Sequence, residues 1–218
     1  MDLKRYKTLV FDCDGVILDS NQLKIQAYQD AAMGFGASET EAKELVDYHV
    51  KLGGISRYHK FEHFLRDIQH RPVQDALMQD LLQRFSHEVV QGLLKCKIAA
   101  GLEQLRRTTA HARWMLVSGG DQSEKNAVFA KLGIAKLFDA GIFGSPDYKD
   151  DILAREKVSG NLQLPALFFG DSRYDHEAAT RADFDFVFVS DWTDFVGWQE
   201  YCAQHNITII NKLEDVCR

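Results

Sequence analysis

The chain carries its most informative signal at residues 10–20, Val10-Phe11-Asp12-Cys13-Asp14-Gly15-Val16-Ile17-Leu18-Asp19-Ser20. Residues 8–11 are an apolar run of strand-forming residues that ends at Asp12, which is typical of a buried strand with a carboxylate at its C-terminal end. Asp12 and Asp14 are two residues apart, so both side chains can face the crevice in which parallel sheets bind ligands. Gly15 then permits a sharp backbone turn. The alternative interpretation is an aspartate-rich turn that only satisfies backbone donors.

Short apolar runs of the same kind recur along the chain and alternate with helix-like stretches. The runs are residues 114–117, 141–143, 166–169, 186–189 and 207–210, and the helix-like stretches include 123–132, 150–159 and 174–182. Near-continuous apolar strands that alternate with helices are typical of a parallel sheet covered on both faces. We therefore predict an α/β fold with a doubly wound, Rossmann-like parallel sheet.

One long segment, residues 21–97, breaks this alternation because it shows only helical periodicity. Apolar residues recur there at three- and four-residue spacing, and Pro72 is a candidate helix start. Roughly seventy residues without a strand exceed what a simple crossover between parallel strands needs. We predict an inserted all-helical domain at residues 21–96, with residues 1–20 and 97–218 forming the core.

Composition excludes several classes of protein. The length of 218 residues suits one core with a smaller insertion. The 26 basic and 32 acidic residues give a formal charge of −6, which argues against binding to nucleic acid or to an anionic membrane surface. We find no signal-peptide pattern and no run of ~18 apolar residues. The four cysteines form no CxxC pair, so we expect a reduced, cytoplasmic protein.

Polar side chains also follow the other predicted strands. Ser118 and the backbone N–H groups that begin at Gly119 follow the second strand, and such groups suit a phosphate oxygen. Lys149 opens a helix after the third strand, against the preference of the helix dipole, although a solvent-facing lysine is the simpler interpretation. Asp171 follows the fourth strand, with Asp175 one helical turn further on.

These groups form one coherent site when they meet at the edge of the sheet. Three converging carboxylates can hold Mg²⁺ through oxygen ligands, and a substrate phosphate can complete the shell. A serine, a lysine and backbone N–H groups can stabilise the phosphoryl oxygens, which is most of what phosphoryl transfer requires. The chain contains no P-loop string, so a nucleotide triphosphatase of that type is not expected.

The motifs together resemble the haloacid dehalogenase-like superfamily of aspartate-nucleophile phosphotransferases, in the family's order and over nearly the whole chain. FDCDGVILDS resembles the first motif, which implies Asp12 as nucleophile and Asp14 as acid/base. GDSRYD resembles the fourth motif, which implies a metal held by Asp12, the backbone carbonyl of Asp14, and Asp171. Asp175 matches the second acid of that motif, either as a metal-shell residue or as one that orients the lysine.

The resemblance extends to the second and third motifs and to the insertion. Ser118 in LVSGG matches the second motif and Lys149 in GSPDYK is similar to the third, which implies phosphate binding by Ser118, Gly119 and Lys149. The helical insertion lies where this family carries its mobile cap. Family dehalogenases lack the second aspartate of the first motif, so Asp14 favours phosphoryl chemistry.

The resemblance implies a Mg²⁺-dependent phosphomonoester hydrolase that acts through an aspartyl phosphate on a small phosphorylated metabolite. Phosphoglycolate and small sugar phosphates are the leading substrates, and we expect a monomer or homodimer. One alternative is a phosphosugar mutase that resembles β-phosphoglucomutase. Another is a catalytically weak binding module, for which the aromatic segment at residues 192–198 would be a partner surface; packing at the sheet edge is the other interpretation of that segment.

The insertion contains a glycine pair flanked by basic residues, KLGGISR, with Lys51, Gly54 and Arg57. This string resembles the cap loop of β-phosphoglucomutases, which implies contact with the sugar part of a substrate; a plain interhelical turn is the alternative. Those mutases carry a histidine where this chain has Lys24, and GDSRYD looks like the phosphatase version of its motif. Phosphonatases form a Schiff base with a cap lysine, but no pattern here indicates a desolvated Lys24 or Lys51.

The insertion also contains His49, His59, His63 and His70. His59 and His63 are one helical turn apart and are a possible pair of metal ligands. A third ligand of matching spacing is not evident and the segment is richly charged. We expect these histidines on a solvated helix face.

Overall fold

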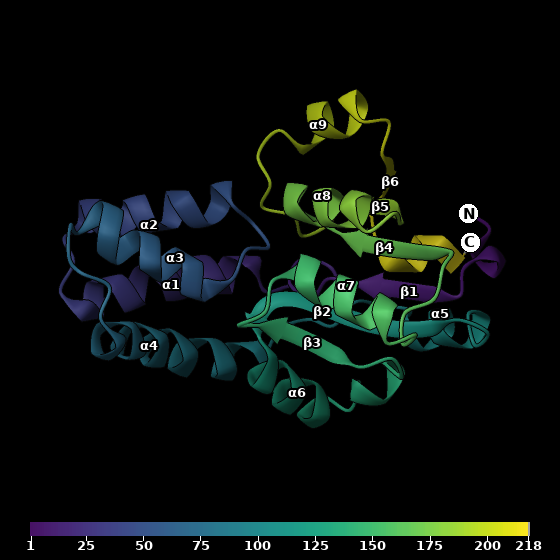
Figure 1. Ribbon diagram of the computed structural model, residues 1–218, viewed down its shortest axis with the longest axis horizontal. Helices are drawn as coiled ribbons and strands as arrows, with labels where there is room; N and C mark the ends of the chain where they lie inside the picture. Colours follow the sequence, from purple (N-terminus) through teal and green to yellow (C-terminus); the bar gives the residue numbers. More distant parts are fainter. Residues whose placement is uncertain (218) are drawn as a thin grey trace.

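The architecture was analysed in a computed structural model, which describes residues 1–217. Its strands form one parallel sheet in the order β3-β2-β1-β4-β5-β6 (Figure 1). The strands are β1 Thr8–Phe11, β2 Arg113–Asp121, β3 Ile142–Ser145, β4 Ala166–Gly170, β5 Asp185–Val189 and β6 Thr208–Ile210. The predicted α/β fold with a parallel sheet is confirmed. From β1 the chain adds β2 and β3 on one side of the sheet and then β4 to β6 on the other. Sheets of this kind bind ligands at this switch point, between β1 and β4.

Helices cover both faces of the sheet because alternate residues of the central strands are apolar on both sides. Leu9 and Phe11 of β1 share a buried cluster with Phe129 of α6, whereas Val10 lies in a second cluster with Leu153 of α7. The helices of the core are α5 Leu102–Thr108, α6 Gln122–Lys131, α7 Lys149–Val158, α8 Arg173–Arg181 and α9 Trp198–Gln204, with short 3₁₀ turns at Leu3–Arg5, Ala135–Leu137 and Leu213–Cys217.

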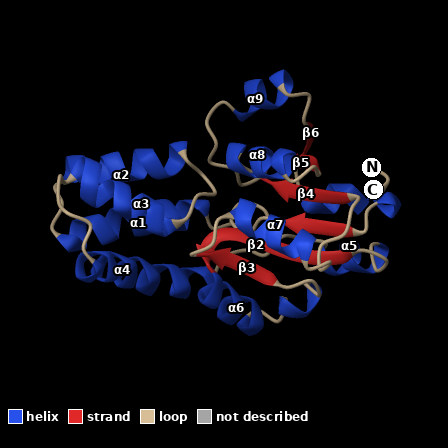
Figure 2. Ribbon diagram, viewed as in Figure 1, coloured by secondary structure: helices blue, strands red, loops and turns tan. Residues whose placement is uncertain are grey.

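The inserted segment is helical and lies beyond the carboxyl ends of the strands (Figure 2). Its helices are α1 Asn21–Phe35, α2 Glu39–Lys51, α3 Arg57–His63 and α4 Asp75–Leu93, with a π-helical turn at Phe64–Ile68. Pro72 does not start a helix: α4 begins at Asp75 after an extended Gln74, so the proline lies in the connection. Among the described residues, no helix has both the length and the hydropathy to cross a membrane.

The two connections between the insertion and the sheet run side by side. Leu18 forms an antiparallel bridge with Ile98, and the Asp19 N–H donates to the carbonyl of Lys97 at 3.0 Å. The Ala99 N–H donates to the carbonyl of Ile17 at 2.9 Å. The segments before and after the predicted insertion therefore form one hydrogen-bonded pair, the hinge of the insertion, and we keep residues 21–96 as the proposed cap.

Candidate active site

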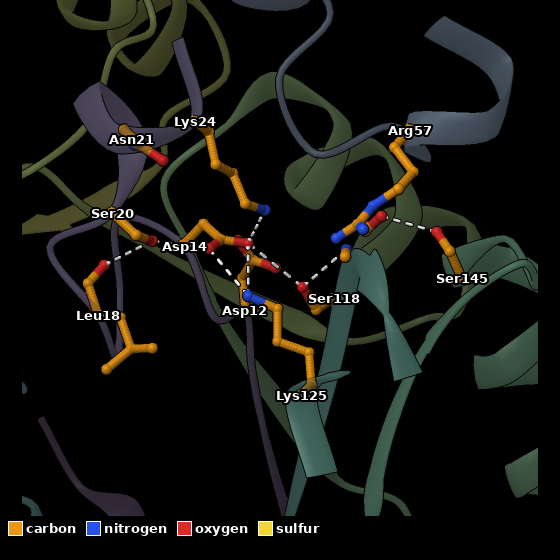
Figure 3. A network of polar contacts seen from close by, with 12 residues as sticks. Asp12, Asp14, Leu18, Ser20, Asn21, Lys24, Arg57, Ser118, Lys125 and Ser145 are labelled. Atoms are coloured by element: carbon orange, nitrogen blue, oxygen red, sulfur yellow. Dashed lines mark hydrogen bonds and ion pairs between the residues drawn. The ribbon is translucent and has the colours of Figure 1, made fainter. Parts of the chain in front are cut away.

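The end of β1 directs two carboxylates toward the insertion. Asp12 and Asp14 are 3% and 8% exposed, and Figure 3 shows them side by side beneath the basic side chains of the insertion. Gly15 follows with φ +80°, and a Cβ there would lie 2.0 Å from Oδ2 of Asp171. A side chain at this position would thus displace the third carboxylate of the site. Strand β4 ends beside β1 and delivers Asp171 to the same edge.

Lys149 joins two of the acids. Its Nζ donates to Oδ1 of Asp12 at 2.7 Å and to Oδ1 of Asp175. Burial alone would lower the pKa of Lys149, but the two carboxylates raise it above its ordinary value, so the side chain remains an ammonium. The interpretation of Lys149 as a solvent-facing lysine is wrong, because the side chain is 1% exposed.

Asp175 has both carboxylate oxygens engaged. One accepts from Lys149, and the other accepts from the backbone N–H of Ser172 at 3.2 Å and from its Oγ at 2.6 Å, within a capping box at the start of α8. Of the two roles that the sequence left open for Asp175, these contacts correspond to orienting the lysine.

The acids at this edge are suited to a cation. Asp12, Asp171 and Asp175 each offer an oxygen, and these oxygens lie within 4.8 Å of one another. Burial, with repulsion from Asp175 and Asp14, raises the pKa of Asp12 to about 6 despite Lys149; burial and neighbouring aspartates raise the pKa of Asp171 well above its usual range. Mutually repelling, oxygen-only ligands fit Mg²⁺, which would keep them ionised.

Asp14 is turned away from that group and is surrounded by donors. It accepts from Ser20 Oγ at 2.6 Å, from Lys24 Nζ, and from Lys125 Nζ at 3.0 and 3.2 Å, as Figure 3 shows. Burial would raise the pKa of Asp14, but Lys125, Lys24 and Ser20 together hold it well below its usual range. Asp14 is therefore ionised in this arrangement.

Two of these lysines depart from the sequence interpretation. Lys125 was not singled out, although it lies in the first turn of α6, where a lysine opposes the helix dipole just as Lys149 does in α7. Lys24 showed no sequence sign of desolvation, yet it is 8% exposed and burial lowers its pKa. Lys24 is desolvated although no sequence pattern indicated it, because α1 directs this residue inward onto Asp14.

The second-motif segment lies under the insertion. Strand β2 continues through Asp121 with an irregular register after Val117, so Ser118 and Gly119 belong to the strand end and not to a separate loop. Ser118 is 1% exposed and its Oγ accepts from the Gly120 N–H at 3.0 Å. A Cβ at Gly119 would lie 2.3 Å from the carbonyl oxygen of Gly54, because the glycine pair of the insertion rests directly on this segment.

Between the acids and the insertion lies a narrow cavity of about 30 Å³. Its wall on the insertion side includes Lys24, Tyr28, His49, Arg57 and Lys60. The Arg57 guanidinium makes a bidentate ion pair with Glu124 of α6, at 2.8 and 2.6 Å, and so connects the insertion to the core. Gly54 and Arg57 of the predicted cap loop line this cavity.

Lys51 lies elsewhere. It is exposed and borders an outer cleft of about 640 Å³, together with Arg173 and Val196. Gly53, Ile55, Ser172 and Asp194 line both spaces, so the cleft adjoins the cavity.

His49 is a second correction within the insertion. It was expected on a solvated helix face, but it is 6% exposed and its Nδ1 lies 2.6 Å from Lys60 Nζ. Burial, aided by Lys60 and Lys24, lowers the pKa of His49 well below its usual range. Burial also lowers the pKa of Lys60 to about 7. The sequence interpretation missed both residues as parts of the cavity wall.

His59 and His63 do not contribute to a metal group among residues 1–217. His63 stacks on Tyr48 with ring centroids 3.7 Å apart, and its Nδ1 bonds to Asp67. These contacts stabilise the surface of the insertion. His59 and His63 are half-buried, so the expected solvated helix face is only partly solvent-exposed.

The aromatic segment after β5 supports the site from the core side. The Trp192 carbonyl accepts from Asn21, whose Nδ2 also donates to Asp171 at 2.8 Å. Thr193 Oγ1 donates to the Asp171 carbonyl at 2.6 Å. Trp198 stacks on Phe188 of β5 at 5.4 Å, which favours packing at the sheet edge over a partner surface. Asp194, which the sequence interpretation overlooked, lines the cavity.

Strand order and the polar edge together place a group of buried carboxylates at the ends of parallel strands, which is the usual position of an active site in an α/β enzyme. Comparison with known proteins specifies the class further. A model of the haloacid dehalogenase-like hydrolases matches residues 6–183, and the chain belongs to this family. The resemblance inferred from the motifs is thus confirmed.

Three relatives illustrate the range of the likeness. A phosphorylated carbohydrates phosphatase of Thermotoga maritima is 24% identical over an alignment of 193 residues that covers 84% of this chain and 84% of its own. The structure of a predicted phosphoglycolate phosphatase from Haemophilus somnus is 16% identical, covers 99% of this chain and 98% of its own, and superposes with a TM-score of 0.71. A β-phosphoglucomutase from Clostridium difficile is 17% identical, with coverages of 94% and 91% and a TM-score of 0.69. Both structures share the fold of this chain.

Proposed function

We propose that this protein is a Mg²⁺-dependent phosphomonoester hydrolase that acts on a small phosphorylated metabolite through a phosphoryl group carried by Asp12. The observation that carries the proposal is the position of Lys149, which holds Asp12 and Asp175 together beside Asp171. The arrangement places a buried nucleophile (Asp12), the ammonium of Lys149 and a cluster of acids next to one another. The relative named as a phosphatase of phosphorylated carbohydrates supports the same class of substrate.

In the first step, an oxygen of Asp12 attacks the phosphorus and the bond to the leaving oxygen breaks, so that Asp12 becomes an acyl phosphate. The ammonium of Lys149 and the backbone N–H groups after Ser118 stabilise charge on the phosphoryl oxygens. Asp12, Asp171 and the backbone carbonyl of Asp14 would hold Mg²⁺, which would supply further positive charge at the phosphate. The leaving oxygen takes a proton from Asp14.

In the second step, Asp14 takes a proton from water, the resulting hydroxide attacks phosphorus, and the bond to Asp12 breaks to release inorganic phosphate. Asp14 is ionised when Lys24 and Lys125 contact it, which is the form that this step needs. The first step needs a proton on Asp14. Lys24 belongs to α1, directly after the hinge, so movement of the cap would separate Lys24 from Asp14 and favour protonation of the acid.

The alternatives differ in their products. A phosphosugar mutase converts a sugar 1-phosphate into the 6-phosphate and releases little inorganic phosphate, whereas a binding module has no turnover. The likeness to a β-phosphoglucomutase keeps the first alternative in view. The occupied positions of the four motifs argue against the second.

The test is release of inorganic phosphate from p-nitrophenyl phosphate and from a panel of phosphorylated metabolites, with and without Mg²⁺. We expect turnover that depends on Mg²⁺ and stops with chelator, while the thermal unfolding midpoint shows a folded protein in both conditions. Isomerisation of a sugar phosphate with little phosphate release would establish the mutase. Absence of any turnover at every Mg²⁺ concentration would establish the binding module.

The compartment and the assembly belong to the same proposal. Cys13, Cys96 and Cys202 are unpaired, which suits a reducing compartment such as the cytoplasm. A monomer or homodimer remains our expectation. Size-exclusion chromatography with light scattering measures it directly.

A further inference from the structure

Lys60 differs from the other buried lysines of the site. Lys24, Lys125 and Lys149 each contact a carboxylate, whereas Lys60 is 2% exposed and forms no ion pair with a carboxylate of residues 1–217. Its contacts are His49 Nδ1 at 2.6 Å and the ring of Tyr28 at 5.5 Å. A buried cation without a counter-ion is unfavourable, so an anion bound in the cavity would stabilise it.

His49 presents an unused donor to the same cavity. Its Nδ1 accepts from the Lys60 ammonium, so the proton of the neutral ring is on Nε2, and Nε2 is buried without a hydrogen-bond partner. The Nε–H of Arg57 is likewise buried and without a partner. Both residues line the cavity. Among residues 1–217, the buried side-chain groups without a partner that belong to the lining of this cavity are therefore N–H donors.

A wall of donors discriminates between kinds of leaving group. A carboxylate only accepts hydrogen bonds, whereas a hydroxyl also carries a proton that needs an acceptor. Asp194 could accept a hydrogen bond from a hydroxyl of the leaving group. It also borders the outer cleft, however, so it lies at the mouth of the cavity where the two spaces meet. The cavity itself holds only a short chain, and a longer leaving group would have to extend into the outer cleft.

We infer that the substrate is the phosphate ester of a short hydroxy acid, whose carboxylate is bound by Lys60 and by Nε2 of His49. This inference rests on the proposed phosphatase function and specifies its substrate class. Lys60 and His49 are then specificity-determining residues that contact the leaving group and leave the phosphate to the core. A neutral polyol or sugar would bring hydroxyl protons to Lys60, Nε2 of His49 and Nε of Arg57, which offer no acceptor.

The test compares two esters of equal length, phosphoglycolate and 2-hydroxyethyl phosphate, with p-nitrophenyl phosphate as a reference. We expect kcat/KM for phosphoglycolate to exceed that for 2-hydroxyethyl phosphate by roughly 10- to 100-fold, the usual value of hydrogen bonds to a charged group. Equal values, or turnover of p-nitrophenyl phosphate without turnover of phosphoglycolate, would overturn the inference and leave the phosphatase function intact. If none of the three esters is cleaved, the result counts against the proposed function itself.

A variant then assigns the preference to Lys60. Lys60→Met keeps a similar length and volume but removes the charge, and we expect kcat/KM for phosphoglycolate to fall by more than that for 2-hydroxyethyl phosphate, so that the preference is lost. Lys43→Met, on the exposed face of α2, is the matched control and should retain the preference. Thermal unfolding reports whether each variant is folded. A folded Lys60→Met that keeps the wild-type preference contradicts the assignment, and the wild-type ratio tests the substrate class without any variant.

Discussion

The core side and the insertion side of the cavity differ in how completely their charged and polar groups find partners. On the core side, Lys149 pairs with Asp12 and Asp175, and Asp14 accepts from two lysines. On the side of the insertion, Lys60 has no carboxylate and Nε2 of His49 has no partner. On the proposed function, the core side would bind the phosphate, which every substrate of this class carries. The other side is incomplete until the variable part of a substrate supplies acceptors.

The largest expected effect is on the core wall. Asp12→Asn keeps the shape and an acceptor oxygen for Lys149 but removes the nucleophile, so we expect kcat/KM to fall by roughly 10⁴-fold or more. The loss should be similar for phosphoglycolate and for 2-hydroxyethyl phosphate, because both use the same phosphate chemistry. Asp30→Asn, on the exposed face of α1, is the control. Full turnover by a verified Asp12→Asn protein would remove Asp12 from its assigned role.

An intermediate effect, on the free energy of unfolding, is expected at the ion pair between Arg57 of the insertion and Glu124 of the core. Arg57→Ala leaves Glu124 without its partner at a buried position, so the free energy of unfolding should fall by about 3 kcal/mol. Arg84→Ala removes an exposed i,i+4 pair with Asp80 in the same insertion and should cost only about 0.5 kcal/mol. Denaturant unfolding measures both variants. Equal losses would show that the Arg57–Glu124 pair does not connect the insertion to the core.

The smallest effect is a pH dependence confined to the cap wall. Burial lowers the pKa of Lys60 to about 7, so the ammonium is present below that pH and is lost above it. The ratio of kcat/KM for phosphoglycolate to that for 2-hydroxyethyl phosphate cancels ionisations that both substrates share. We expect this ratio to fall roughly tenfold between about pH 6 and pH 8.

The charged and titratable groups that act on Lys60 are His49, Tyr28, Lys24 and Asp194, together with Asp14 and Lys149 of the core. Lys60→Met should abolish the slope of the ratio with pH. A slope that persists in this variant would assign the titration to another of these groups.

The sequence predicted those parts that depend on local patterns. The apolar runs around Val10 and Phe168 located strands to within a few residues, because strands buried on both faces are continuously apolar. Asp12 and Asp171 were found because residues that follow parallel strands meet at one edge. Lys149 was found through its position against the helix dipole.

The rest of the site depends on contacts between distant elements. Lys60 and His49 lie on different helices, and a sequence pattern does not state which face of α2 and α3 meets the cavity. A buried charged residue has no local signature, so these residues read as solvated. Lys125 had the same dipole signal as Lys149, and attention to first-turn lysines would have identified it.

The close contact between Gly119 and Gly54 leaves no room for a methyl group between the strand end and the cap. A Cβ at Gly119 would overlap the Gly54 carbonyl at 2.3 Å, and that carbonyl belongs to the part of the chain that the hinges carry. Gly119→Ala would thus act as a wedge that holds the cap away from the strand end without touching a charged group. In a library of random substitutions at Gly119, the largest side chain that still permits activity would show how closely the cap must approach the strand end for turnover.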